Sequence, residues 1–210
     1  TPQNDGPTVD ALASITTTEG DFIKNQGASS TYYPDFGWYG GLEVMAPAEG
    51  YMLNVAEGSV LTYPNFGAGD ALTREMSVKE LPLAVSDWEV DYHDYEFNGH
   101  ITMSIDSRED SHGDYIAVFS GDECRGVAER MYFPFGDSYM YSVMVYSNET
   151  EGEKLSFKYY NSDDVEIVEY VDSKEFIVNK NYGNDLSPVS LSNIATPEEF
   201  SLRGAYPNPF

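Results

Sequence analysis

The chain has 210 residues, 41% hydrophobic and 14% aromatic, enough for one large domain or two smaller ones with real cores. Its 36 Asp and Glu against 11 Lys and Arg give a formal net charge of −25, which repels phosphate backbones and anionic lipids and argues against nucleic acid and bare membranes as partners. No apolar run approaches the ~20 residues that a membrane span needs, and the single cysteine, Cys124, excludes a disulfide within the chain.

The first third of the chain predicts a linker and then a small β subdomain. Residues 1–12 are polar, contain Pro and Gly and show no periodicity, as is typical of linkers. Over residues 13–64, short apolar runs alternate with turn chemistry such as Pro34–Gly37. Residues 51–55 and 59–63 have the pattern of a hairpin pair.

A connector and a larger β domain follow. Residues 65–87 lack regular strand periodicity, and 73–81 has the composition of one short helix that ends at Pro82. Over 88–191 the strand signal is stronger, and its segments are spaced near the intervals typical of sandwiches. The expected strands are 100–105, 114–119, 124–129, 138–146, 155–160, 165–171 and 175–178.

We therefore predict an all-β fold, with an antiparallel β-sandwich or jelly roll over 88–191. The two β portions either form separate subdomains or share one core. In the longest strand, 138–146, both alternating faces carry apolar and aromatic residues, so we expect both faces to be covered.

The chain ends on a distinctive string. Residues 192–204 predict a second linker, and residues 205–210 have the sequence Ala-Tyr-Pro-Asn-Pro-Phe. This string resembles the opening of the C-terminal sorting domain of the Bacteroidetes type IX secretion system, which implies a parent protein that is secreted or held at the outer cell surface. The segments 32–64 and 114–128 resemble repeat modules of such proteins, which implies an extracellular, repeated, non-catalytic unit. The alternative for the tail is a turn-rich terminus, which needs no sorting machinery.

Aromatic residues around the Pro34–Gly37 turn form the candidate ligand site. Exposed rings stack on the apolar faces of sugars, while neighbouring Asp and Asn bind hydroxyls. The alternative is that Trp38 and Tyr39 fill a core. A second aromatic group surrounds Pro134 and contains Tyr132, Phe133, Phe135 and Tyr139. The candidate site, called here the aromatic platform, consists of Tyr32, Tyr33, Phe36, Trp38 and Tyr39.

The loop 106–114 is the candidate calcium site. Calcium takes about six to eight oxygen ligands, which acidic loops provide. The loop supplies Asp106, Glu109, Asp110 and Asp114, and Gly113 permits a sharp turn, but the spacing does not match an EF-hand. The alternative is a hairpin turn in which Asp and Ser side chains bond their own backbone.

Signals for catalysis are weak. The chain has three histidines and no Gly-x-Ser-x-Gly elbow, and the alternating context of Cys124 predicts a buried thiol. His93 and His100 are a poor zinc signal, and 36 acids contain glycosidase-like pairs by accident.

We therefore predict a non-catalytic extracellular module of a larger secreted protein, carbohydrate-binding or adhesive, with polysaccharide or neighbouring protein modules as partners. One alternative is a structural repeat, a spacer or filament subunit that self-assembles. A weaker one is a metal-dependent hydrolase.

Overall fold

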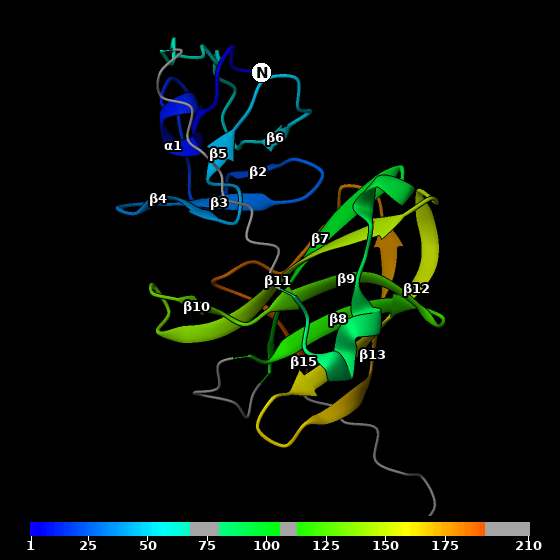
Figure 1. The fold of residues 1–210 in the computed structure, drawn as a ribbon. Coiled ribbons are helices and arrows are strands. Elements are labelled where there is room, and N and C mark those ends of the chain that lie inside the picture. Colours follow the sequence, from blue (N-terminus) through cyan, green and yellow to red (C-terminus); the bar gives the residue numbers. More distant parts are fainter. Residues whose placement is uncertain (68–79, 106–112, 192–210) are drawn as a thin grey trace, which may run out of the picture.

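The computed structural model describes residues 1–67, 80–105 and 113–191 (Figure 1). It confirms the all-β sandwich fold, since the strands form several sheets whose pairs are antiparallel apart from two short parallel ones. The expected linker 192–204, the sorting-like string 205–210 and nearly all of the expected helix 73–81 lie outside the described residues.

Residues 1–67, called here the N-terminal unit, have their own small core. Two sheets build it, ordered β4-β3-β2-β6 and β1-β5. The core residues are Ala11, Leu12, Ile15, Ile23, Leu42 and Met45. The elements are β1 (Gly6–Pro7), α1 (Thr8–Ala11), β2 (Phe22–Lys24), β3 (Ser29–Tyr33), β4 (Gly37–Gly40), β5 (Val44–Met45) and β6 (Met52–Asn54).

Two expectations about this unit differ from the structure. Residues 1–12 do not form a free linker, because β1 pairs with β5 and the single turn of α1 buries Ala11 and Leu12 in the core. The turn is too short for a periodic signal. Residues 51–55 and 59–63 do not form a hairpin, because β6 pairs with β2 and no strand covers 59–63.

The second β portion is a sandwich of two sheets around an apolar core that includes Ile101, Val118, Val143 and Phe157. One sheet has the order β10-β11-β7-β14, with β15 also on β7, and the other β13-β12-β8-β9. The strands are β7 (Phe97–Ile105), β8 (Tyr115–Ser120), β9 (Glu123–Glu129), β10 (Met131–Phe133), β11 (Ser138–Ser147), β12 (Glu151–Asn161), β13 (Glu166–Ile177), β14 (Asn181–Tyr182) and β15 (Val189–Leu191).

The expected strands of this portion are present, with 165–171 and 175–178 joined into the one strand β13. The two sheets approach closely where β9 meets β11. A Cβ at Gly126 would lie only 2.1 Å from the Met144 carbonyl oxygen, so this position requires glycine. The 3-10 helix η1 (Leu83–Trp88) packs Val85 and Trp88 against β8, so the end of the expected connector belongs to the sandwich.

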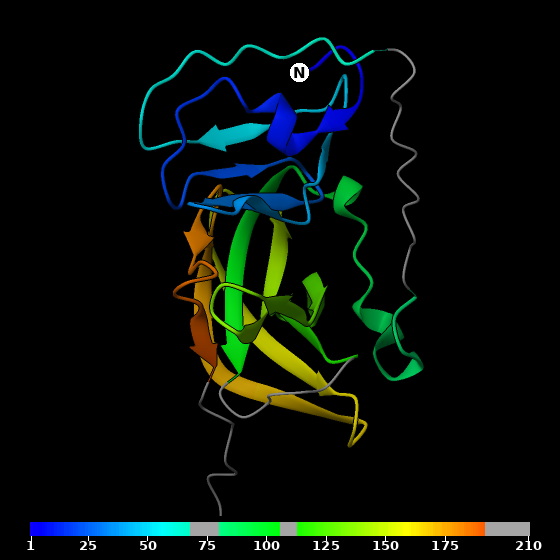
Figure 2. The same cartoon turned by 90° about the vertical axis from the view of Figure 1, so that its left-hand side faces the viewer.

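The N-terminal unit lies across one end of the sandwich (Figures 1 and 2). Two of its contacts fall on the faces of β7 and β11 that point away from the sandwich core: the Phe22 ring packs on His100, and the Tyr146 hydroxyl donates to the Gln26 carbonyl. Along β11 the residues Tyr141, Val143 and Val145 face the sandwich core instead. Both faces of β11 are therefore covered, as its sequence predicts.

Within the described residues, no helix is long and apolar enough to cross a membrane.

Candidate functional site

The aromatic platform is divided between the two faces of the β3–β4 hairpin. Tyr32 lies directly opposite Trp38, and their rings make an edge contact at 5.6 Å on one face, where Trp38 packs against the core of the N-terminal unit. Tyr33 points to the other face, because successive side chains of a strand alternate. The five residues do not form one stacking surface.

Three platform residues pack against the second aromatic group. Tyr33 is 3% exposed and its ring lies 5.3 Å from that of Phe133, while Phe36 and Tyr39 lie 3.8 and 5.3 Å from Phe135. We call Tyr33, Phe36, Tyr39, Phe133 and Phe135 the aromatic clasp. It joins the N-terminal unit to the sandwich.

Hydrogen bonds complete the clasp. The Tyr39 hydroxyl donates to the Tyr132 carbonyl at 2.7 Å, and the Tyr33 hydroxyl donates to the Asp185 carboxylate. Burial raises the pKa of Asp185 above its ordinary value, and it raises the pKa of the Tyr33 phenol as well. Of the platform residues, Phe36 keeps the largest open area, with 64% of its surface exposed.

Of the four candidate calcium ligands, Asp114 is described, whereas Asp106, Glu109 and Asp110 lie outside the described residues. The buried Asp114 carboxylate accepts hydrogen bonds from the Tyr159 hydroxyl at 2.5 Å and from the Ser162 amide and hydroxyl at 2.9 and 2.7 Å. These bonds tie the β12–β13 turn to the start of β8. In 1–67, 80–105 and 113–191 no group of three or more His, Cys, Asp or Glu is placed to hold a metal. The calcium site stays a prediction.

A groove opens where the N-terminal unit meets the segment after η1. Its first part is a hollow of about 430 Å³, lined by residues that include Asn25, Gln26 and Glu49 on one side and Tyr92 and His93 on the other. A second hollow of about 350 Å³ shares Asn25, Gln26 and Gly50 with the first and continues along the junction. We call the two hollows together the junction groove.

One wall of the groove is an aromatic shelf formed by Tyr92 and the exposed His93. Both belong to the 3-10 helix η2 (Tyr92–Asp94), and their ring centroids lie 4.2 Å apart at 30°. The Asp91 carboxylate accepts from the His93 amide and lies 3.0 Å from Nδ1 of the same ring, which fixes the ring's orientation. These contacts lower the pKa of Asp91.

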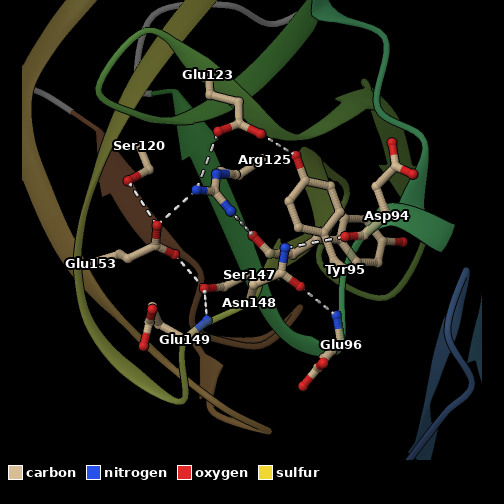
Figure 3. Close-up of polar contacts among 11 residues, drawn as sticks. Asp94, Tyr95, Glu96, Ser120, Glu123, Arg125, Ser147, Asn148, Glu149 and Glu153 are labelled. Carbon is tan, nitrogen blue, oxygen red and sulfur yellow. Dashed lines mark hydrogen bonds and ion pairs between the residues drawn. The ribbon is translucent and has the colours of Figure 1, made fainter.

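Two further tyrosines continue the aromatic row behind the shelf. The ring of Tyr146 lies 6.0 Å from those of both Tyr92 and Tyr95 in near-parallel orientation. The Tyr95 hydroxyl donates to Glu123 at 2.7 Å, and the Arg125 guanidinium lies 5.1 Å from the Tyr95 ring centroid (Figure 3). Burial, followed by the hydrogen bond to Glu123, raises the pKa of Tyr95 to about 12.

Arg125 anchors this row to the sandwich. Its Nη2 lies 2.7 Å from the Glu153 carboxylate and 3.4 Å from that of Glu123. The other Glu153 oxygen accepts from the Ser147 hydroxyl. Arg125 is buried and paired with two carboxylates, so its guanidinium has a fixed position beside the Tyr95 ring (Figure 3).

Side-chain amides hold the backbone of the shelf segment. Asn148 donates to the Asp94 carbonyl at 3.1 Å and accepts from the Glu96 amide at 2.9 Å (Figure 3). Gln26 donates from the N-terminal unit to the carbonyls of Tyr92 and Tyr95 at 3.1 and 3.4 Å. The shelf is therefore fixed from both β portions.

The opposite wall presents a fixed carboxylate. Oε2 of Glu49 accepts from the Asn25 amide at 2.9 Å and from the Tyr51 hydroxyl at 2.8 Å. The turn that carries Glu49 places Ala48 at a φ of 65° and bonds the Ala46 amide to the same Tyr51 hydroxyl at 2.6 Å. The hydrogen bonds from Asn25 and Tyr51 therefore fix the orientation of the Glu49 carboxylate before a ligand binds.

Two buried basic groups lie at the junction. Lys24 is 2% exposed, and its ammonium donates to the backbone and side-chain oxygens of Asn98. Burial lowers its pKa to about 8. His100 has its Nε2 2.8 Å from the Ser142 hydroxyl, and burial, with a smaller contribution from Lys24, lowers its pKa to about 4. His100 is therefore neutral near pH 7.

Cys124 is a buried strand thiol, as its sequence context predicts. Its sulfur donates to the Trp88 carbonyl at 3.2 Å, and burial raises its pKa to about 11. The thiol is protonated near pH 7, which makes it a poor nucleophile.

The shelf is not among the sites that the sequence predicts, although His93 is a weak zinc candidate. Tyr92 and His93 lie in the run Asp-Tyr-His-Asp-Tyr, which mixes acids with aromatic residues just before β7 begins at Phe97. That signal marks an exposed aromatic segment. Its neighbours Asn25 and Glu49 come from more than 40 residues away, and only the fold brings them together. No protein-family model matches the chain, and no curated protein and no solved structure is significantly similar to it.

Proposed function

We propose that the protein is a non-catalytic, carbohydrate-binding module of an exported protein, and that it binds its ligand in the junction groove rather than on the aromatic platform. The observation that carries this proposal is the first hollow, of about 430 Å³, which is lined by both an aromatic shelf and a preset carboxylate.

The lining of the groove suits the chemistry of a sugar. A pyranose ring has an apolar C–H face that stacks on an aromatic ring, and hydroxyls that bond to amides and carboxylates. Tyr92 and His93 supply the rings, and Glu49 supplies a held acceptor. Because the shelf and the carboxylate are fixed before binding, little side-chain entropy is lost when the ligand enters.

The shape of the groove favours an oligosaccharide or polysaccharide over a single sugar. Its two hollows adjoin through shared lining residues, so an extended ligand can occupy both. Export is supported by the resemblance of residues 205–210 to a secretion sorting signal and by the acidic composition, which suits a solvated extracellular module. A secreted or outer-surface module that holds a polysaccharide is consistent with all of these features.

A polysaccharide pull-down with the full chain tests the proposal. Tyr92→Ala removes the inner ring of the shelf, and we expect its affinity for a retained polysaccharide to fall about tenfold, the equivalent of about 1.4 kcal/mol. Phe36→Ala is the matched control, since it removes an exposed aromatic ring of the platform away from the groove. Retention of no polysaccharide, or equal affinity in the Tyr92 variant, would contradict the proposal.

A second candidate function is a structural spacer, and the aromatic clasp favours it. The clasp and the Lys24–Asn98 contact tie the two β portions together across their junction. Small-angle scattering of two copies of the chain joined in tandem distinguishes the two functions. A spacer requires ordered end-to-end assembly, whereas a binding module does not.

A further inference from the structure

We infer that the ligand of the junction groove is a polysaccharide with protonated amino groups, such as a chain of deacetylated amino sugars. This inference rests on the proposed function and narrows it from carbohydrates in general to cationic ones.

Carboxylates occur in both hollows of the groove. Glu49 lines the first hollow, and Glu96 lines the second and is exposed. A chain that passes from one hollow to the other therefore meets an acidic side chain in each. Repeating ammonium groups along a polysaccharide match this arrangement.

In the described part of the groove, the one Lys or Arg among the lining residues is already hydrogen-bonded within the protein. Lys24 lines the second hollow, but its side chain is 2% exposed and its ammonium is bonded to two oxygens of Asn98. It is not placed to neutralise an incoming anion. With a formal net charge of −25 on the whole chain, the field at the groove attracts cations and repels acidic polysaccharides.

The aromatic shelf selects a cationic sugar over other cations. An ammonium is attracted both to a carboxylate and to the face of an aromatic ring, and an amino sugar adds a rigid apolar face that stacks on Tyr92. A basic peptide carries its charge on flexible stems and loses more side-chain entropy on binding. The shelf and Glu49 line the same hollow, so a bound chain of amino sugars meets both.

Calorimetry with a fully deacetylated glucosamine hexamer and its fully N-acetylated counterpart tests the inference on the full chain. We expect the deacetylated hexamer to bind more tightly, and its binding to weaken in high salt and between about pH 6 and about pH 8, as the amino groups lose their protons. Glu49→Gln keeps an oxygen for Asn25 and Tyr51 but removes the charge, so we expect affinity to fall about tenfold or more. Glu57→Gln removes the same charge from an exposed position of the same unit and is expected to change affinity less than about twofold.

Each other outcome overturns the inference in a distinguishable way. If the N-acetylated hexamer binds as tightly and Tyr92→Ala weakens it, the ligand is a neutral sugar and the proposed function stands without this inference. If neither hexamer and no other polysaccharide binds, both fail. Equal losses in the two Glu variants would show unspecific charge attraction. Binding of polylysine that is as tight and as sensitive to Glu49→Gln would identify a basic peptide as the ligand.

Discussion

The aromatic clasp and the aromatic shelf are both rich in aromatic rings, but the clasp is packed closed and the shelf borders an open hollow. Both gather aromatic rings at the junction of the N-terminal unit and the sandwich. In the clasp, rings from both sides pack on one another, with Phe133 at 0% and Tyr33 at 3% exposure and Phe36 at the open margin. At the shelf, the facing wall is polar, with Asn25 and Glu49, and a hollow remains.

The difference shows that the partner surface decides the role of an aromatic cluster. Rings that meet apolar rings lose water-exposed area and stabilise the fold. Rings that meet amides and carboxylates already engaged in hydrogen bonds leave space for a ligand. Clustered aromatic residues in a sequence therefore identify a junction without saying whether it is closed.

Phe133→Ala disrupts the aromatic clasp and has the largest expected effect. Phe133 contacts the rings of Tyr33, Tyr39 and Phe135, so its loss leaves a cavity in the clasp. We expect the free energy of unfolding, measured with urea, to fall by about 3–5 kcal/mol. Phe36→Ala, at the exposed margin, is expected to cost less than about 1 kcal/mol. Similar losses in the two variants would mean that the clasp is not a packed core.

A pH titration tests the polar part of the junction. The pKa of His100 is about 4 in the folded protein against 6.5 when unperturbed. Between these values the unfolded chain binds a proton that the folded protein does not, so stability falls as the pH drops from 6.5 to 4. The loss is limited to about 3 kcal/mol.

His100→Gln isolates this contribution. Urea unfolding at several pH values is expected to show a flatter decline in the variant than in the wild type. Parallel curves for His100→Gln and the wild type would mean that His100 does not stay neutral in the fold.

Asn148→Ala tests how the backbone of the aromatic shelf is held, and it has the smallest expected effect. It removes the bonds to the Asp94 carbonyl and the Glu96 amide, and exposed hydrogen bonds of this kind contribute about 1 kcal/mol. We expect faster hydrogen exchange at Glu96 with the clasp unaffected. Asn161→Ala removes similar bonds from the distant β12–β13 turn and should leave exchange at Glu96 as it was. Unchanged exchange in the Asn148 variant would show that the Asn148 side chain does not hold the backbone of the shelf segment.

Much of the sandwich could be predicted because its strands carry a local signal. The segment 138–146 has apolar residues on both faces, and β11 is covered on both. Residues 6–12 could not be predicted, because one helical turn and a two-residue strand are too short for periodicity. Residues 59–63 have strand composition, yet β6 pairs with β2, since the pairing partner of a strand is a long-range choice.

The sequence by itself determined the all-β class, the positions of the long strands, the buried thiol of Cys124 and the acidic field, because these depend on alternation and composition along the chain. The tertiary structure alone decided that the two aromatic groups close on each other and that Tyr92, His93 and Glu49 face one hollow. The physical reason is that burial of a ring depends on what the fold places opposite it, and that surface comes from a distant part of the chain.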